Sequence, residues 1–259
     1  MDILKVTWST LALVLGLIVG SFLNVCIYRL PLSQSIVYPG SRCPSCDTSL
    51  KWYHNIPVVS FMLLRGRCAF CGASISPVYP LVELCMGLLS LSLFIYFGFT
   101  VRFVCYFLLA AALVVVAFID LKTRIIPDAI SLPGMVVGLL SSFVRSDISF
   151  WESLAGLLIG GGSLLLVSLG YYALTKREGM GMGDVKLMGM IGAFLGWRSI
   201  LFVILSGSFL GAISGMFLMF KNREDSKLAI PFGPFLSLGA LLYIFWGSSL
   251  MAWYFHLLR

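Results

Sequence analysis

The chain has 259 residues, of which 59% are hydrophobic and only 11% are charged. A soluble domain carries about a quarter charged residues, so the composition excludes a soluble protein and predicts an all-α protein that crosses a membrane many times. The net charge of +7 is explained by Lys and Arg in the loops of one side and by contact with anionic lipid, and we do not interpret it as nucleic-acid binding.

Eight apolar runs have about the length that a membrane helix needs, although the fourth and sixth are short of the usual 20 or so residues. The first run, Trp8–Tyr28, exceeds the core of a signal peptide, which is about 7–15 residues long, so we expect it to stay as the first helix. The eight runs cover residues 8–28, 78–98, 103–119, 129–144, 153–175, 185–197, 199–220 and 229–255.

The loops between these runs predict an orientation, because Lys and Arg favour the cytoplasmic side. Thirteen of the 18 basic residues fall on one side and five on the other, which places both termini outside and the first loop in the cytoplasm. Treating 185–220 as a single helix would move a basic cluster to the outside, so the pattern favours eight helices. The connections that carry the thirteen are 29–77, 120–128, 176–186 and 221–228.

Three parts follow from this count. Residues 1–28 form the first helix, residues 29–77 form a polar cytoplasmic loop, and residues 78–259 form a membrane domain of seven helices.

The polar loop contains two CxxC pairs separated by 21 residues. Four thiolates in this arrangement are typical of a tetrahedral zinc site of the zinc-ribbon kind, and four cysteine ligands leave no open position for catalysis. The predicted ligands of this structural zinc are Cys43, Cys46, Cys68 and Cys71.

Disulfides are the competing interpretation of these cysteines, but thiols stay reduced in the cytoplasm. We expect His54, which lies between the pairs, to be a surface or packing residue rather than a ligand. Cys26, Cys85 and Cys105 fall in apolar runs and behave there as small hydrophobic residues.

Two carboxylates stand at the edges of apolar runs, where charge is costly and marks a candidate site. Asp120 closes the third run, and Asp184 follows the glycine-rich segment Gly179–Gly183. Under the predicted orientation both lie at the cytoplasmic face, and two neighbouring carboxylates that share a proton can activate water as in aspartyl proteases.

The alternative is that each Asp is a helix cap or a counter-ion for Lys122, Arg124, Lys176 or Lys186. Asp128, directly after Pro127, fits a cap of the fourth helix best. The glycines before Asp184 favour a site there, because they permit positive φ angles and the close approach of an extended substrate.

Polar residues also occur in the first two runs. Glu83 is either a site residue or a partner of Arg29 or of a basic residue in the cysteine loop, and Asn24 fits a hydrogen bond between helices. Near the last run, Pro231–Pro234 either shapes a substrate groove or kinks a helix.

Most of the chain resembles the prepilin peptidases, also called type IV leader peptidases, which are GxGD aspartyl proteases of the membrane. The segments that carry the resemblance are Gly20–Pro31, the two CxxC pairs, Trp52–Val58, Tyr79–Leu84, Asp120 with Ile126-Pro127-Asp128, Gly181-Met182-Gly183-Asp184-Val185-Lys186, and Ile230–Phe235.

The resemblance implies a peptidase of the bacterial inner membrane that removes the short basic leader of type IV prepilins and pseudopilins, with Asp120 and Asp184 as its catalytic pair. Members with the cysteine loop also methylate the new amino terminus with S-adenosylmethionine. The candidate residues for binding this cofactor are Asn24, Arg29 and Glu83. The cysteine loop belongs to the same candidate region.

Other functions fit the sequence less well. A peptidase without methyltransferase activity is the nearest alternative. An ion-coupled transporter with a regulatory zinc ribbon would have charges at mid-membrane and internal repeats, and neither is evident. A non-enzymatic assembly factor would leave the glycines before Asp184 without a role.

Overall fold

The computed structural model describes residues 3–176, 180–222 and 231–257. In these ranges the chain is helical, and its only β-structure is two isolated bridges in the polar loop. The all-α prediction is therefore confirmed for the described residues. The chain divides into two compact units, residues 1–115 and 116–259.

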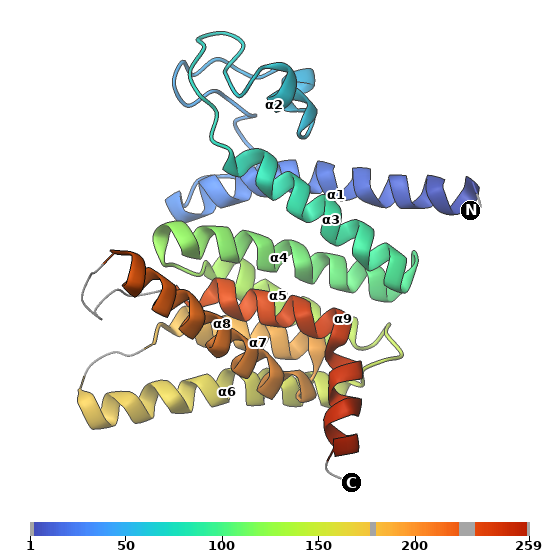
Figure 1. Ribbon diagram of the computed structural model, residues 1–259, viewed down its shortest axis with the longest axis vertical. Coiled ribbons are helices and arrows are strands. Elements are labelled where there is room, and N and C mark those ends of the chain that lie inside the picture. The colour runs from blue at the N-terminus through green and yellow to red at the C-terminus, as the bar shows by residue number, and fades with distance from the viewer. Residues whose placement is uncertain (1–2, 177–179, 223–230, 258–259) are drawn as a thin grey trace. The chain divides into compact units, whose positions relative to one another are not determined.

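Eight helices of 14 residues or more lie in the described ranges (Figure 1). Five of them, α1, α3, α4, α6 and α8, are long and apolar enough to cross a membrane, which makes the chain a multi-pass membrane protein. The helices are α1 (Ile3–Arg29), α3 (Val78–Phe97), α4 (Val101–Thr123), α5 (Asp128–Ser141), α6 (Phe150–Thr175), α7 (Met182–Leu195), α8 (Arg198–Asn222) and α9 (Gly233–Leu257).

The chain breaks between the sixth and seventh predicted runs, as expected. Helix α7 ends at Leu195, Gly196 adopts a φ of +77°, and α8 begins at Arg198. A positive φ costs glycine little and stops a helix. Four of the basic residues used for the orientation lie outside the described residues, namely Arg177, Arg223, Lys227 and Arg259.

In the first unit, α1 and α3 pack closely because small residues line their contact. A Cβ atom on Gly16 would lie 2.5 Å from Met86 O, and one on Gly20 would lie 2.7 Å from Glu83 Cα. The buried Ser90 hydroxyl donates a hydrogen bond of 2.6 Å to Ala12 O. Small residues and interhelical hydrogen bonds are the usual means of helix association in membranes.

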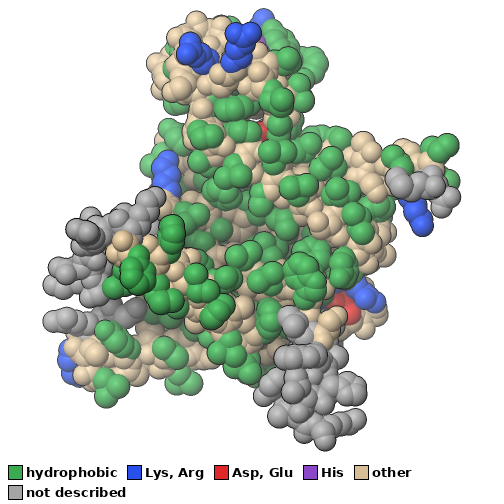
Figure 2. Space-filling view, in the orientation of Figure 1, with side chains coloured by type: hydrophobic (Ala, Val, Ile, Leu, Met, Phe, Trp, Pro, Cys, Tyr) green, Lys and Arg blue, Asp and Glu red, His purple; other side chains and the backbone are tan. Residues whose placement is uncertain are grey.

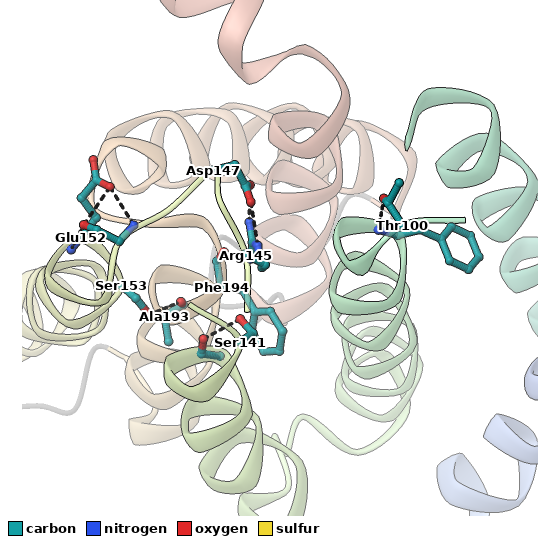
Figure 3. A network of polar contacts seen from close by, with 11 residues as sticks. Thr100, Ser141, Arg145, Asp147, Glu152, Ser153, Ala193 and Phe194 are labelled. Atoms are coloured by element: carbon teal, nitrogen blue, oxygen red, sulfur yellow. Dashed lines mark hydrogen bonds and ion pairs between the residues drawn. The ribbon is translucent and has the colours of Figure 1, made fainter. Parts of the chain in front are cut away.

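In the second unit, α6 and α7 approach through Gly156 and Gly192, whose backbones leave no space for a side chain on either. The buried Ser153 hydroxyl on α6 donates to Ala193 O on α7 at 2.5 Å (Figure 3). Helix α6 begins with a capping box formed by Ser149 and Glu152, which satisfies its first free N–H groups.

A buried arginine holds the C-terminal end of α7. Arg145 Nη1 donates to Phe194 O at 2.8 Å, and its Nη2 pairs with Asp147 Oδ2 at 2.6 Å (Figure 3). A cation at a helix C-terminus complements the helix dipole. This contact fixes the end of α7 opposite to Asp184.

Apolar side chains cover much of the helical surface (Figure 2). On α6, for example, Leu158 is 61% exposed and Leu166 is 72% exposed. A water-soluble protein rarely exposes apolar surface on this scale, whereas helices in lipid turn such side chains outward.

Candidate active site and metal centre

The two CxxC pairs of the polar loop form two knuckles with the same backbone structure. An isolated bridge joins Arg42 to Ser49 in the first, and an equivalent bridge joins Arg67 to Ser74 in the second. In each knuckle the residue after the second cysteine has a positive φ, 52° at Asp47 and 71° at Gly72.

Hydrogen bonds repeat as well. The N–H groups of Cys43 and Cys68 donate to Thr48 O and Ala73 O, at 3.0 and 2.8 Å. The knuckles therefore present paired sulfur atoms in equivalent ways, although 25 residues separate their corresponding positions.

The four predicted ligands come together. The sulfur atoms of Cys43, Cys46, Cys68 and Cys71 all lie within 4.8 Å of one another. Cys43 Sγ and Cys71 Sγ are 3.8 Å apart, which is about the spacing of two sulfurs that each lie 2.3 Å from a tetrahedral zinc ion. All seven cysteines are free thiols. The geometry and the donor set therefore fit zinc, and disulfides are not formed.

Hydrogen bonds at Cys46 favour the thiolate form of this thiol. The Thr48 hydroxyl, with Oγ1 3.3 Å from Cys46 Sγ, lowers the pKa of that thiol to about 6. A thiolate is the form that binds metal. The His54 ring packs edge-on against Tyr53 and Phe70 and is not part of the sulfur cluster.

In the second unit, Asp120 lies one turn before the end of α4 and is 5% exposed. Its Oδ2 accepts a hydrogen bond of 3.0 Å from the backbone N–H of Gly233, the first residue of α9. Free N–H groups at a helix N-terminus attract a carboxylate. The α9 start therefore holds the Asp120 side chain in place.

Asp184 is the third residue of α7. Its Oδ1 is buried and has no hydrogen-bond partner among the described residues. An orphaned buried carboxylate oxygen is costly, and native proteins retain few of them outside functional sites. The Asp120 and Asp184 carboxylates interact electrostatically.

The Ile126 side chain lies close to two glycines, Gly183, which precedes Asp184, and Gly233, whose N–H bonds Asp120. A Cβ atom on Gly183, next to Asp184, would lie 2.9 Å from Ile126 Cβ. One on Gly233 would lie 2.7 Å from Asp120 Oδ2 and 3.2 Å from Ile126 Cδ1. A side chain at either position would therefore displace Ile126 or the Asp120 carboxylate.

This finding changes the explanation of the glycine-rich segment. The sequence indicated that these glycines permit positive φ angles and close approach; Gly181 has a φ of −72° and Gly183 is helical, so neither uses a positive φ. Gly183 serves close approach, and the approaching group is the Ile126 side chain, whereas a Cβ atom on Gly181 would meet nothing closer than Asp184 Oδ2 at 3.8 Å.

The expected cap at Asp128 is wrong. Pro127 is the N-cap of α5, and no side chain caps that end. Both oxygens of Asp128 lie 2.7 Å from Lys186 Nζ. The counter-ion alternative is therefore the one that holds for Asp128, and the ion pair joins the starts of α5 and α7.

The three candidate cofactor residues lie in the first unit, and each bonds a backbone group. Asn24 Nδ2 donates to Tyr79 O at 3.0 Å, which confirms a hydrogen bond between α1 and α3. Arg29 donates to the carbonyl oxygens of Ser35 and Gly40. Glu83 Oε2 accepts from the N–H of Val58 at 2.7 Å, so this carboxylate bonds the loop backbone, while Arg29 bonds other carbonyl groups.

Two residues of the site were not singled out by the sequence. Gly233 was noted only within the segment Pro231–Pro234, as a possible substrate groove or helix kink and as part of a motif, and Ile126 only as part of a motif. The Gly-Pro step at residues 233–234 was an available signal, because it leaves an N–H free at the start of a helix.

Comparison with known proteins supports the family resemblance found in the sequence. Residues 14–97 match the bacterial peptidase A24 N-terminal domain, and residues 107–216 match the type IV leader peptidase family. No solved structure matches the chain.

Relatives of the chain carry the name prepilin leader peptidase/N-methyltransferase, and three of them illustrate the similarity. The protein of Stutzerimonas stutzeri is 36% identical over 96% of this chain and 94% of its own length. The protein of Pseudomonas aeruginosa is 35% identical over 93% of this chain and 91% of its own length. That of Myxococcus xanthus is 45% identical over 80% of this chain and 62% of its own length. The chain belongs to the family of the bifunctional prepilin leader peptidase/N-methyltransferases.

Proposed function

We propose that the chain cleaves the short basic leader from type IV prepilins and pseudopilins, with Asp120 and Asp184 as its catalytic pair. The buried Oδ1 of Asp184, which has no hydrogen-bond partner among the described residues, is the observation that carries this proposal. Its carboxylate interacts with that of Asp120, and a buried polar atom without a partner is suited to a water or a substrate group.

The chemistry follows from the pairing of two acids. Neighbouring carboxylates do not both ionise easily, so one keeps a proton while the other draws a proton from water. The water then attacks the carbonyl carbon of the scissile peptide bond. The protonated Asp stabilises the oxyanion and afterwards protonates the leaving amine.

The depth of the pair fits a substrate that is itself inserted in the membrane. Asp120 is near the C-terminal end of α4 and Asp184 is at the N-terminal end of α7. We propose that all eight long helices cross the inner membrane, with both termini outside, so that these two ends face the cytoplasm. A basic leader stays on that side.

The loop of residues 29–77 would bind one zinc ion through Cys43, Cys46, Cys68 and Cys71. Four thiolates complete a tetrahedron, so the ion has a structural role. The proposed domain arrangement is a first helix, this zinc loop and the seven-helix peptidase domain over residues 78–259.

The second activity is methylation of the new N-terminal amine. S-adenosylmethionine would supply the methyl group from its sulfonium. We place this reaction in the region of Asn24, Arg29, Glu83 and the zinc loop. Since all three side chains already bond backbone groups, they are suited to shaping a pocket more than to lining it with free donors and acceptors.

The test uses purified protein, a prepilin peptide with its leader, and labelled S-adenosylmethionine. Mass spectrometry reports the cut and the added methyl group separately. The proposal predicts both products from the wild type. A second reaction with a pre-cleaved peptide measures methylation alone. Protein that is folded and zinc-loaded but yields neither product would contradict the proposal.

A further inference from the structure

The zinc loop contains a strained turn at Val58. This residue has φ +60° and ψ −47°, and the N–H of Val59 donates to Pro57 O at 2.6 Å across it. An i to i+2 hydrogen bond with a positive φ at the centre is a γ-turn of the rare, strained hand. A β-branched residue is especially disfavoured there.

The Glu83 carboxylate is the group that holds this turn. Its Oε2 accepts a 2.7 Å hydrogen bond from the N–H of Val58 itself. Glu83 is 8% exposed on α3. A hydrogen bond to a buried carboxylate is stronger than one between neutral groups.

The position of Glu83 depends in turn on the packing of the two helices. Gly20 of α1 lies against the backbone of Glu83, with no space for a Cβ atom. The helices therefore fix the carboxylate, and the carboxylate fixes the loop.

The turn organises the segment between the two knuckles. It directly precedes the short helix α2 (Val59–Leu63), in which the Ser60 hydroxyl donates to Tyr53 O at 2.7 Å. Tyr53 lies in the 3-10 helix Trp52–Asn55. The bond to Glu83 thus ties residues 52–63 to the N-terminal part of α3.

We propose that Glu83 is a positioning residue for methyl transfer: it acts by holding the strained Val58 turn, and through it segment 52–63, and does not contact the methyl donor or the amine. Strained residues persist where the surrounding structure fixes them, and they gather at functional sites. This inference rests on the proposed methyltransferase function and gives Glu83 a definite role in it.

The experiment compares three substitutions of Glu83 in the full-length enzyme with pre-cleaved peptide. Glu83→Gln keeps an acceptor oxygen, and we expect methylation within about fivefold of the wild type. Glu83→Met fills similar space without an oxygen acceptor, and we expect a loss of about tenfold or more. Glu83→Met with Val58→Gly removes the strain, because glycine adopts positive φ readily, and we expect most of the loss to be restored.

Val59→Gly in the Glu83→Met background is the matched control. It also replaces a valine by glycine, one residue further on but inside α2, and we expect no restoration. Amide hydrogen exchange of residues 56–64 is measured on every variant. Exchange should rise in Glu83→Met and return toward the wild-type rate only with Val58→Gly.

A direct chemical role for Glu83 gives the opposite pattern. Glu83→Gln would then lose methylation as severely as Glu83→Met, and Val58→Gly would restore nothing, which would overturn the proposal. If the wild type methylates no peptide, the proposed second activity fails. The exchange rates still decide whether Glu83 holds the turn, and unchanged rates in Glu83→Met would refute it.

Discussion

Asp120 Oδ2 accepts a 3.0 Å hydrogen bond from the backbone N–H of Gly233, 113 residues further along the chain. The contact joins the end of α4 to the start of α9. The other acid, Asp184, has a buried oxygen that bonds none of the residues the structure describes. One carboxylate is thus oriented by the backbone, and the other is available to a ligand. Such an asymmetric environment is suited to a pair of acids with different roles.

Replacement of Gly233 by Ala should impair cleavage. The added methyl group would lie 2.7 Å from Asp120 Oδ2 and 3.2 Å from Ile126 Cδ1. A displacement of about 1 Å at a catalytic group can cost about a hundredfold in rate, so we expect a loss of ten- to about a hundredfold in kcat. Leader cleavage is measured on a prepilin peptide. Gly162→Ala is the control, because nothing lies within 4 Å of its added Cβ, and a larger loss there would contradict the steric argument.

The peptidase pair itself predicts complete dependence on both acids. Asp120→Asn and Asp184→Asn should each lower cleavage by at least about a thousandfold, since neither amide can exchange a proton with water as a carboxylate does. Circular dichroism checks that both variants keep their helices. Asp47→Asn, at an exposed site in the zinc loop, should cleave normally. Substantial activity in a folded Asn variant would remove that residue from the pair.

The ion pair of Asp128 and Lys186 should matter less. Their side chains are 56% and 31% exposed, and an exposed ion pair is worth about 1 kcal/mol or less. We expect Asp128→Asn to lower thermal stability slightly and to retain most of the cleavage rate. Exchange of the two charges, Asp128→Lys with Lys186→Asp, should recover the lost stability. Abolished cleavage by a folded Asp128→Asn protein would instead place Asp128 in the active site.

Metal analysis should find about one zinc ion per chain, as four thiolate ligands require. Changing Cys43 and Cys46 together to Ser should remove it and expose residues 43–71 to protease, because metal binding and folding are coupled in such small sites. Cys85→Ser, which alters a cysteine outside the cluster, should keep the metal. If residues 43–71 stay resistant to protease in metal-free protein, zinc does not stabilise the fold of this loop.

The amino-acid sequence by itself determined the class of the fold and the elements of chemistry. Apolar runs of membrane length predict helices, because a helix satisfies all the hydrogen bonds of its backbone N–H and C=O groups within one segment in lipid. The spacing within each CxxC pair is local, so the knuckles could be predicted as well. Asp120 and Asp184 stood out because charge at the edge of an apolar run is costly.

Only the tertiary structure decided which groups meet. The bond from Gly233 to Asp120, the pair of Asp128 with Lys186, and the bond from Val58 to Glu83 link positions 113, 58 and 25 residues apart. No local pattern encodes such contacts, because they depend on how closely the helices approach. That approach is set by glycines, and hydropathy does not distinguish a glycine that meets Ile126 from one with open space around it.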